Sequence, residues 1–154
     1  MATARQLEHA KGDLYEQDFT VWIEDQAQAL RARQIGALDW DNLLEEIESM
    51  GRSEKNALKS RLRVLLMHLI KWKWQPEKRS QSWLETVIEQ RASIEEILEM
   101  SPSLGTTTLP DAFSGVWAKA ISLAALETGL PPSTFSPACP WSMDEVLRED
   151  WMPE

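Results

Sequence analysis

The spacing of the apolar residues is the feature that most narrows the folds open to this chain. Apolar side chains recur every three or four residues along most of the sequence, and strictly alternating runs of strand length are missing. Spacings of three and four place side chains on one face of an α-helix, whereas a strand alternates with a period of two. We therefore predict an all-α fold, a compact helical bundle of about five main helices with a proline-rich C-terminal strap and a short final helix.

Capping and breaking residues predict the ends of the first three helices. The first helix ends near Gly36. Asp39 can cap a second helix that has Gly51 as its natural stop, and Ser53 can cap a third that is closed by Pro76. The apolar faces of the three helices are, in order, Tyr15, Phe19, Trp22, Ile23, Gln26 and Leu30; Trp40, Leu43, Leu44, Ile47 and Met50; and Leu58, Leu62, Leu65, Leu66, Leu69 and Ile70.

The second half of the chain continues the helical pattern. Ser80 or Ser82 opens a fourth helix that ends at Ser101 and Pro102, and after a loop a fifth helix runs from about 111 to 128. Its inward positions hold Phe113, Val116, Trp117, Ala120, Ile121 and Ala124.

The C-terminal region has a different composition. Four prolines between Gly129 and Pro140 predict an ordered, non-helical strap. Ser142 and Glu145 then have the spacing of a capping box for a short last helix. We expect residues 1–12 to be flexible and residues 13–154 to form a single helical domain.

Length and composition bound the class of protein. A chain of 154 residues can bury a core without a metal or a disulfide, and Cys139 has no second cysteine to pair with, which suits a reducing cytoplasm. The longest nearly apolar stretch, Val64 to Ile70, is too short for a membrane span, and residues 1–12 lack the apolar core of a secretory signal. We expect a soluble cytoplasmic protein with no membrane association, in which most of the eight tryptophans pack in the core.

Charge is unevenly distributed along the chain, although the net charge is −9. Residues 39–54 hold one basic and six acidic side chains, whereas residues 55–79 hold eight basic and one acidic. The second helix is therefore acidic and the third is basic, and we expect the two to pair as consecutive antiparallel helices. Solvent-exposed ion pairs of this kind contribute only ~0–1 kcal/mol each.

Arg91 is the most informative polar residue, because its spacing places it on the apolar face of the fourth helix. A buried guanidinium needs a partner, so we expect a carboxylate to face it from another helix. Helical projection places Arg61 and His68 along one edge of the third helix's inward arc. Glu46 and Glu48 lie at the two edges of the second helix's apolar face. These positions predict a partly buried polar cluster of Arg61, His68 and Arg91 with Glu46 or Glu48.

Two interpretations of this cluster remain open. It is either a structural ion-pair network or a pocket, which would be a metal site using His68 and Glu48 or an anion site using Arg61 and Arg91. Because His9 lies in the N-terminal segment, His68 stands alone and the metal signal is weak. No catalytic constellation or phosphate-loop motif is present, and we expect no catalytic residues, metal or cofactor.

A second candidate site is the basic surface of the third helix and the turn that follows it. Lysine and arginine interleaved with Trp72 and Trp74 resemble a nucleic-acid surface. The charge is spread around the helix and the sequence pI is about 4.8, both of which disfavour phosphate-backbone binding. The residues of this possible surface are Lys59, Arg63, Lys73, Lys78 and Arg79.

Several separated segments resemble one bacterial family in the same order, from about Leu14 to Pro153. They are Tyr15-x-x-Asp18-Phe19-x-x-Trp22; Asp39-Trp40-x-x-Leu43-x-Glu45-Glu46-Ile47-Glu48-x-x-Gly51; Ser60-Arg61-Leu62-x-x-Leu65-Leu66-x-His68-Leu69-x-Lys71-Trp72; Arg79-x-x-Ser82-Trp83; Ser101-Pro102-Ser103-Leu104; and Cys139-Pro140-Trp141. Together these are similar to the domain-of-unknown-function 29 family.

The resemblance implies a compact helical bacterial protein and brings no activity with it. The polar residues in the matching segments include Glu45, Glu48, Arg61, His68, Lys71, Arg79 and Arg91, which partly overlap the predicted cluster. Glu45 points outward in a helical projection, so it joins the cluster only if the second helix is bent or starts elsewhere.

The leading functional hypothesis is a non-enzymatic bacterial protein-interaction or regulatory module, for example one half of a two-protein system. One alternative is an enzyme or a small-ligand or anion-binding protein that uses the cluster around His68 and Arg91. The other is nucleic-acid binding through residues 55–79. The partner expected under the leading hypothesis is a protein, rather than nucleic acid or a membrane.

Overall fold

The computed structural model describes Met1, Thr3, Gln6 and residues 13–154. The predicted flexibility of residues 1–12 concerns a segment that lies largely outside the described residues, as does His9. Among the described residues every regular element is helical, which confirms the all-α prediction. No helix in this part of the chain has the length and apolar content needed to cross a membrane.

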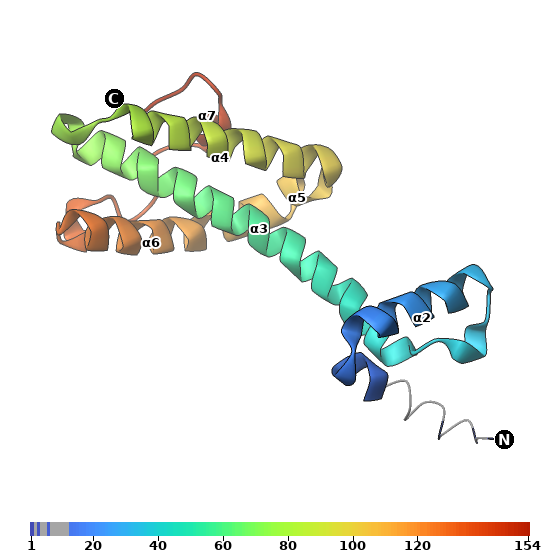
Figure 1. Cartoon of the computed structure of the whole chain (residues 1–154). Helices are drawn as coiled ribbons and strands as arrows, with labels where there is room; N and C mark the ends of the chain where they lie inside the picture. The colour runs from blue at the N-terminus through green and yellow to red at the C-terminus, as the bar shows by residue number, and fades with distance from the viewer. Residues whose placement is uncertain (2, 4–5, 7–12) are drawn as a thin grey trace. The chain divides into compact units, whose positions relative to one another are not determined.

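Figure 1 shows the order of the elements along the chain. A short helical stretch at 13–17 precedes the numbered elements. These are α2 (Phe19–Arg31), η1 (Ile35–Ala37), α3 (Trp40–Trp74), η2 (Pro76–Lys78), α4 (Gln81–Met100), α5 (Ser103–Thr106), α6 (Thr108–Thr128), η3 (Pro132–Thr134) and α7 (Met143–Leu147), where η marks a 3-10 helix.

The predicted break at Gly51 is wrong, because α3 passes through this residue without interruption. Gly51 is exposed, and a Cβ built on it would meet no atom within 4 Å. A glycine inside a helix costs only about 1 kcal/mol relative to alanine, which the helix-forming residues around it offset. Ser53 is therefore not a cap but an interior residue of α3, and the acidic and basic segments are consecutive parts of one helix rather than an antiparallel pair.

Other predicted helix ends were closer to the structure. Ser80 caps α4 by accepting a hydrogen bond from the Trp83 amide, and Ser142 and Glu145 form the capping box of α7. The fifth helix begins at Thr108, three residues before the predicted start, and the loop before it contains α5.

The chain divides into two compact units, Met1–Arg52 and Ser53–Glu154. In the first unit, Trp22, Gln26 and Ala29 of α2 are buried, and so is Leu38. The Trp22 indole N–H donates to the Asp39 carboxylate at 3.0 Å, and the Asp39 backbone N–H donates to the Gln26 side-chain oxygen at 2.7 Å. These two bonds fix the start of α3 against α2.

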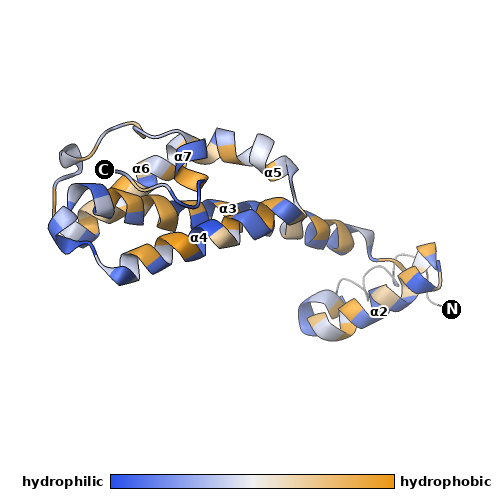
Figure 2. Ribbon diagram, turned by 90° about the horizontal axis from the view of Figure 1, so that it is seen from above, coloured by the Kyte–Doolittle hydropathy of each residue, from blue (hydrophilic) through white to orange (hydrophobic). Residues whose placement is uncertain are grey.

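The second unit is a helical bundle with one continuous core. In Figure 1 the C-terminal half of α3 lies between α4 and α6, and Figure 2 shows apolar and hydrophilic residues alternating along the helices as amphipathic packing requires. Six apolar residues of α3 have no exposed surface: Leu58, Leu62, Leu65, Leu66, Leu69 and Ile70. The apolar face predicted for the third helix is therefore the centre of this core.

The C-terminal strap is part of the core and does not merely cover it. Phe135 of the strap and Trp141, which directly follows the strap, pack edge-on or tilted against Trp74 of α3, and Trp141 also contacts Trp117 of α6 and Trp151. The Trp117 indole N–H donates to the Ser136 carbonyl at 3.0 Å. The strap is non-helical except for the 3-10 turn at Pro132–Thr134.

Seven of the eight tryptophans are buried or half-buried, and Trp40 is the exception, with 60% of its surface exposed. The prediction that most tryptophans pack internally is therefore correct. Trp40 belongs to the first unit, where it leaves a large indole in solvent.

A substitution at Gly51 tests the continuity of α3. Gly51→Ala should raise the free energy of unfolding by about 0.5–1 kcal/mol, because alanine is the better helix former and its methyl group enters open space. Gly129→Ala is the matched control, since Gly129 has φ of 72° and an alanine there is strained. Urea unfolding followed by far-UV circular dichroism measures both, and a destabilised Gly51→Ala protein would mean that the helix is interrupted at this residue.

Candidate functional site

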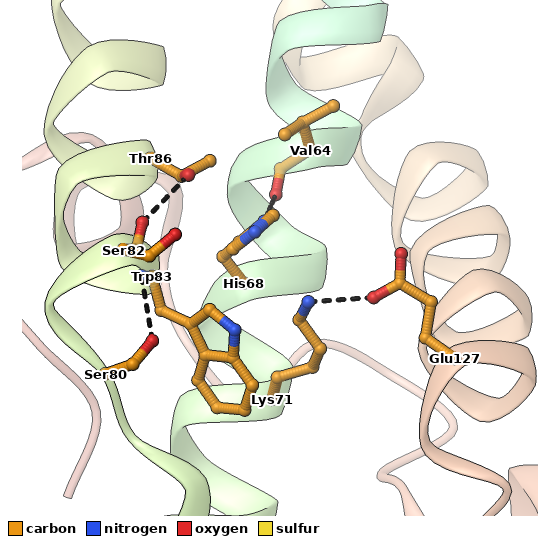
Figure 3. A network of polar contacts seen from close by, with 8 residues as sticks. All are labelled: Val64, His68, Lys71, Ser80, Ser82, Trp83, Thr86 and Glu127. Carbon is orange, nitrogen blue, oxygen red and sulfur yellow. Dashed lines mark hydrogen bonds and ion pairs between the residues drawn. The ribbon is translucent and has the colours of Figure 1, made fainter.

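Lys71 and Arg91 are the two charged residues of the second unit that are buried, and sequence reasoning did not place Lys71 in the predicted polar cluster. Its Nζ lies 2.8 Å from Oε2 of Glu127 on α6 and 4.9 Å from the centre of the Trp83 ring on α4. The Lys71 side chain is 9% exposed and that of Glu127 is 48% exposed. Figure 3 shows Lys71 extending from α3 toward Glu127, with the indole of Trp83 alongside. The three residues link the three long helices of the bundle.

His68 lies one turn before Lys71 and is half-buried. Its Nδ1 is 2.9 Å from the Val64 carbonyl oxygen, so Nδ1 carries the proton and donates it (Figure 3). Burial lowers the pKa of His68, and the positive charge of Lys71 lowers it further, against the opposing effects of the Val64 carbonyl and Glu127. His68 is therefore neutral at pH 7, with Nε2 as its free acceptor atom.

Arg91 is buried, as its place among the apolar residues of the fourth helix predicted, but its partners are not the expected carboxylate. Its Nε, Nη1 and Nη2 donate to the backbone carbonyls of Val146, Glu149 and Trp151 at 2.9, 3.1 and 2.7 Å. Burial lowers the pKa of Arg91 and the negative charge of Asp150 opposes this effect. The planar guanidinium, whose N–H donors have a fixed geometry, thus binds residues near the C-terminus to α4.

The residues of the predicted polar cluster bond to separate partners. Glu45 forms an exposed ion pair with Arg52 at 2.7 Å, and Glu46 accepts a hydrogen bond from the Tyr15 hydroxyl, which raises the pKa of Tyr15. Glu48 is exposed on the same turn of α3.

The other predicted members lie in the second unit. Arg61 is exposed and makes one long hydrogen bond, 3.5 Å, to Gln90. The grouping of Arg61 with the three glutamates assumed a chain reversal at Gly51, and α3 has no reversal there.

The predicted basic surface also separates into different environments. Lys73 lies over the Trp74 ring, and Arg79 lies over the Trp72 ring while its Nε donates to the Trp72 carbonyl at 2.9 Å. Lys78 is exposed in η2. Lys59 and Arg63 line a groove between α3 and α6 together with Lys119, which lies outside the predicted segment.

Comparison with known families identifies the chain. It matches the family described as Domain of unknown function DUF29 over residues 14–152, which is nearly its whole length. The chain therefore belongs to this family, as the resemblance indicated. No curated protein and no solved structure matches the chain.

Arg91 variants test the role of the guanidinium. Arg91→Leu leaves three carbonyl groups without their donor and should lower the free energy of unfolding by about 3–5 kcal/mol. Arg91→Lys, which has no planar fork, should recover only part of this loss. Arg61→Leu is the control and should change stability by less than about 0.5 kcal/mol, because Arg61 is exposed. Urea titration supplies the energies, and an Arg91→Leu protein as stable as the parent would contradict the assignment.

His68 predicts a specific dependence of stability on pH. Its pKa is lower in the folded chain than the value near 6.5 of an unfolded chain, so the unfolded state binds more protons between the two values. The free energy of unfolding should therefore fall as the pH drops through about 6.5. His68→Asn, which keeps an N–H near the position of Nδ1, should remove this slope between about pH 5 and pH 7 while leaving the slope at lower pH. An unchanged slope in the variant would show that His68 does not titrate as inferred.

Proposed function

We propose that this chain is a non-enzymatic protein-interaction or regulatory module of the bacterial cytoplasm, and that it binds its partner through an apolar surface of the first unit. The observation that carries the proposal is a run of large apolar residues on one face of α3, which we call the apolar stripe: Trp40, Leu44, Ile47 and Met50. Their exposed fractions are 60, 56, 60 and 61%. The cytoplasmic location is supported by the single cysteine, which suits a reducing compartment.

The shape of the apolar stripe favours a helical partner. Its residues are spaced by four, three and three positions, so they follow one helix face over about 15 Å. A partner helix can lay its own apolar face along such a row, with anchors at matching spacings. Gly51 lies at the end of the stripe, where a Cβ would meet open space, so its bare backbone leaves room for a partner side chain.

The charges beside the apolar stripe favour a basic partner. Asp41 and Glu48 are exposed on its border. Residues 39–54 have one basic and six acidic side chains, a net charge of 1 − 6 = −5. Lysine or arginine flanking the partner's apolar face would complement this charge and accelerate association. A second copy presenting the same stripe would instead place two acidic borders at one interface, which is unfavourable.

The proposal predicts selective binding of a basic amphipathic helix. A synthetic Leu/Lys peptide of about 18 residues, long enough for five turns, should bind, whereas its Leu/Glu counterpart should not. Replacing Leu44 and Ile47 by serine should weaken binding at least about tenfold, since apolar burial supplies the affinity. Calorimetry at two salt concentrations measures both effects.

Exposed apolar residues of the second unit provide the matched control. Ile88→Ser with Leu126→Ser removes at least as much exposed apolar surface from the second unit, since these residues are 52 and 81% exposed. This control should bind the basic peptide as the parent protein does. If both double variants lose binding equally, the attraction is non-specific and the proposed surface is wrong.

A further inference from the structure

The groove between α3 and α6 is a second feature of the chain, and it has the opposite charge to the apolar stripe. Its volume is about 490 Å³, within the range of small-molecule sites. Three basic residues line it: Lys59 and Arg63 from α3 and Lys119 from α6. Asp111 is the one acidic residue of its lining, so the charged residues sum to 3 − 1 = +2. A local excess of positive charge is notable in a chain whose net charge is −9.

Helical spacing explains how these side chains come together. Lys59 and Arg63 are four residues apart on α3 and therefore project from the same face. Asp111, Gly115 and Lys119 are also four residues apart in succession on α6. Both rows line the groove.

The basic residues of the groove are not neutralised by ion pairs. Within the part of the chain that the structure describes, Lys59, Arg63 and Lys119 make none, whereas Lys71 and Arg52 each contact a carboxylate. The one side-chain hydrogen bond of Arg63 is a long one, 3.4 Å, from Nη2 to the Ser60 hydroxyl. Arg63 and Lys119 also border a neighbouring depression of about 450 Å³, so they lie where the two hollows adjoin.

The remaining lining provides neutral hydrogen-bonding groups and open space. Asn56, Ser60 and Ser114 add amide and hydroxyl groups beside the basic ones. Gly115 has no side chain, and a Cβ built on it would meet nothing within 4 Å, so this part of α6 leaves the groove open. Ala112 and Val116 give the wall an apolar portion.

We propose that this groove binds a small phosphate monoester that carries hydroxyl groups, of the size of a sugar phosphate or a nucleoside monophosphate. The phosphate group is bound by Lys59, Arg63 and Lys119, because charge-assisted hydrogen bonds to phosphate are the strongest that these side chains make. Asp111 accepts hydrogen bonds from ligand hydroxyl groups, and the serine and asparagine side chains complete the polar contacts. Inorganic phosphate alone fills a small part of the volume and binds more weakly.

Titration with glucose 6-phosphate, AMP, inorganic phosphate and glucose tests the proposal by calorimetry and by amide NMR. The monoesters should bind more tightly than inorganic phosphate, glucose should not bind, and the amide signals of Ser60, Ser114 and Gly115 should shift. No binding of either monoester, or shifts confined to other residues, would overturn the proposal.

Variants with the same change in net charge distinguish a specific phosphate site from general electrostatic attraction of anions. Replacing Lys59, Arg63 and Lys119 by glutamine should weaken monoester binding at least about a hundredfold, since each charge-assisted bond is worth a tenfold change or more. The control replaces Lys55, Lys78 and Arg148, which lie outside the groove, by glutamine, so that both triple variants lose three positive charges. Equal losses in the two triple variants would overturn the assignment.

Gly115 gives a test that leaves the basic residues intact. Gly115→Glu places a carboxylate in the open space of the groove and should abolish monoester binding, whereas Gly115→Ala should keep the fold and retain most of the affinity. Retained binding in a folded Gly115→Glu protein would contradict the proposal. A single-stranded oligonucleotide that binds far more tightly than AMP, and equally in both triple variants, would replace the small-ligand site with a nucleic-acid surface.

Discussion

The unbroken helical hydrogen bonding of α3 through Gly51 is the constraint on which the other features depend. A turn at this residue would have allowed the acidic residues 39–54 to fold back on the basic residues that follow. Because α3 is continuous, its N-terminal part belongs to the first unit and its C-terminal part to the core of the second. The basic side chains of α3 and of the turn after it then take other partners: Lys71 pairs with α6, Lys73 and Arg79 lie over indole rings, and Lys59 and Arg63 face a groove.

The second unit closes through its C-terminal residues rather than through the long helices alone. Trp141 and Val146, far along the chain, belong to the same core as the leucines of α3. Arg91 holds three carbonyls of this segment, so one guanidinium satisfies backbone acceptors that would otherwise lack a donor. Removal of the segment would therefore expose aromatic surface and deprive Arg91 of its three carbonyl partners.

Local signals in the sequence predicted most of the helices, because their causes are local. The apolar spacing around Leu58 and Leu69, the cap at Ser80 and the capping box at Ser142 depend on residues within a turn or two of each other. The prediction of a helix end at Gly51 was wrong for a related reason. A glycine is compatible with either a helix end or a helix interior, and residues beyond the next turn or two decide between them. The burial of Arg91 was predictable from the apolar residues around it on the fourth helix. Its carbonyl partners lie 55–60 residues away and carry no side-chain signature.

The two proposed surfaces differ in sign and in the length of chain that forms them. The apolar stripe and its acidic border come from about three turns of one helix, so periodicity and charge in the sequence located both sets of residues. The sequence analysis expected the apolar residues to pack in the bundle, whereas they are exposed. The groove needs Lys119, which lies 56 residues after Arg63 and is an isolated basic residue in an otherwise ordinary helix. Sequence therefore pointed to Lys59 and Arg63 as part of a long basic surface. The packing of α3 against α6 instead selects two of those residues and adds a third, while Lys73 and Arg79 lie over tryptophan rings and Lys78 is exposed in η2. A short basic groove suits a compact anion better than an extended polyanion, and this is why a small phosphate monoester is the ligand proposed for it.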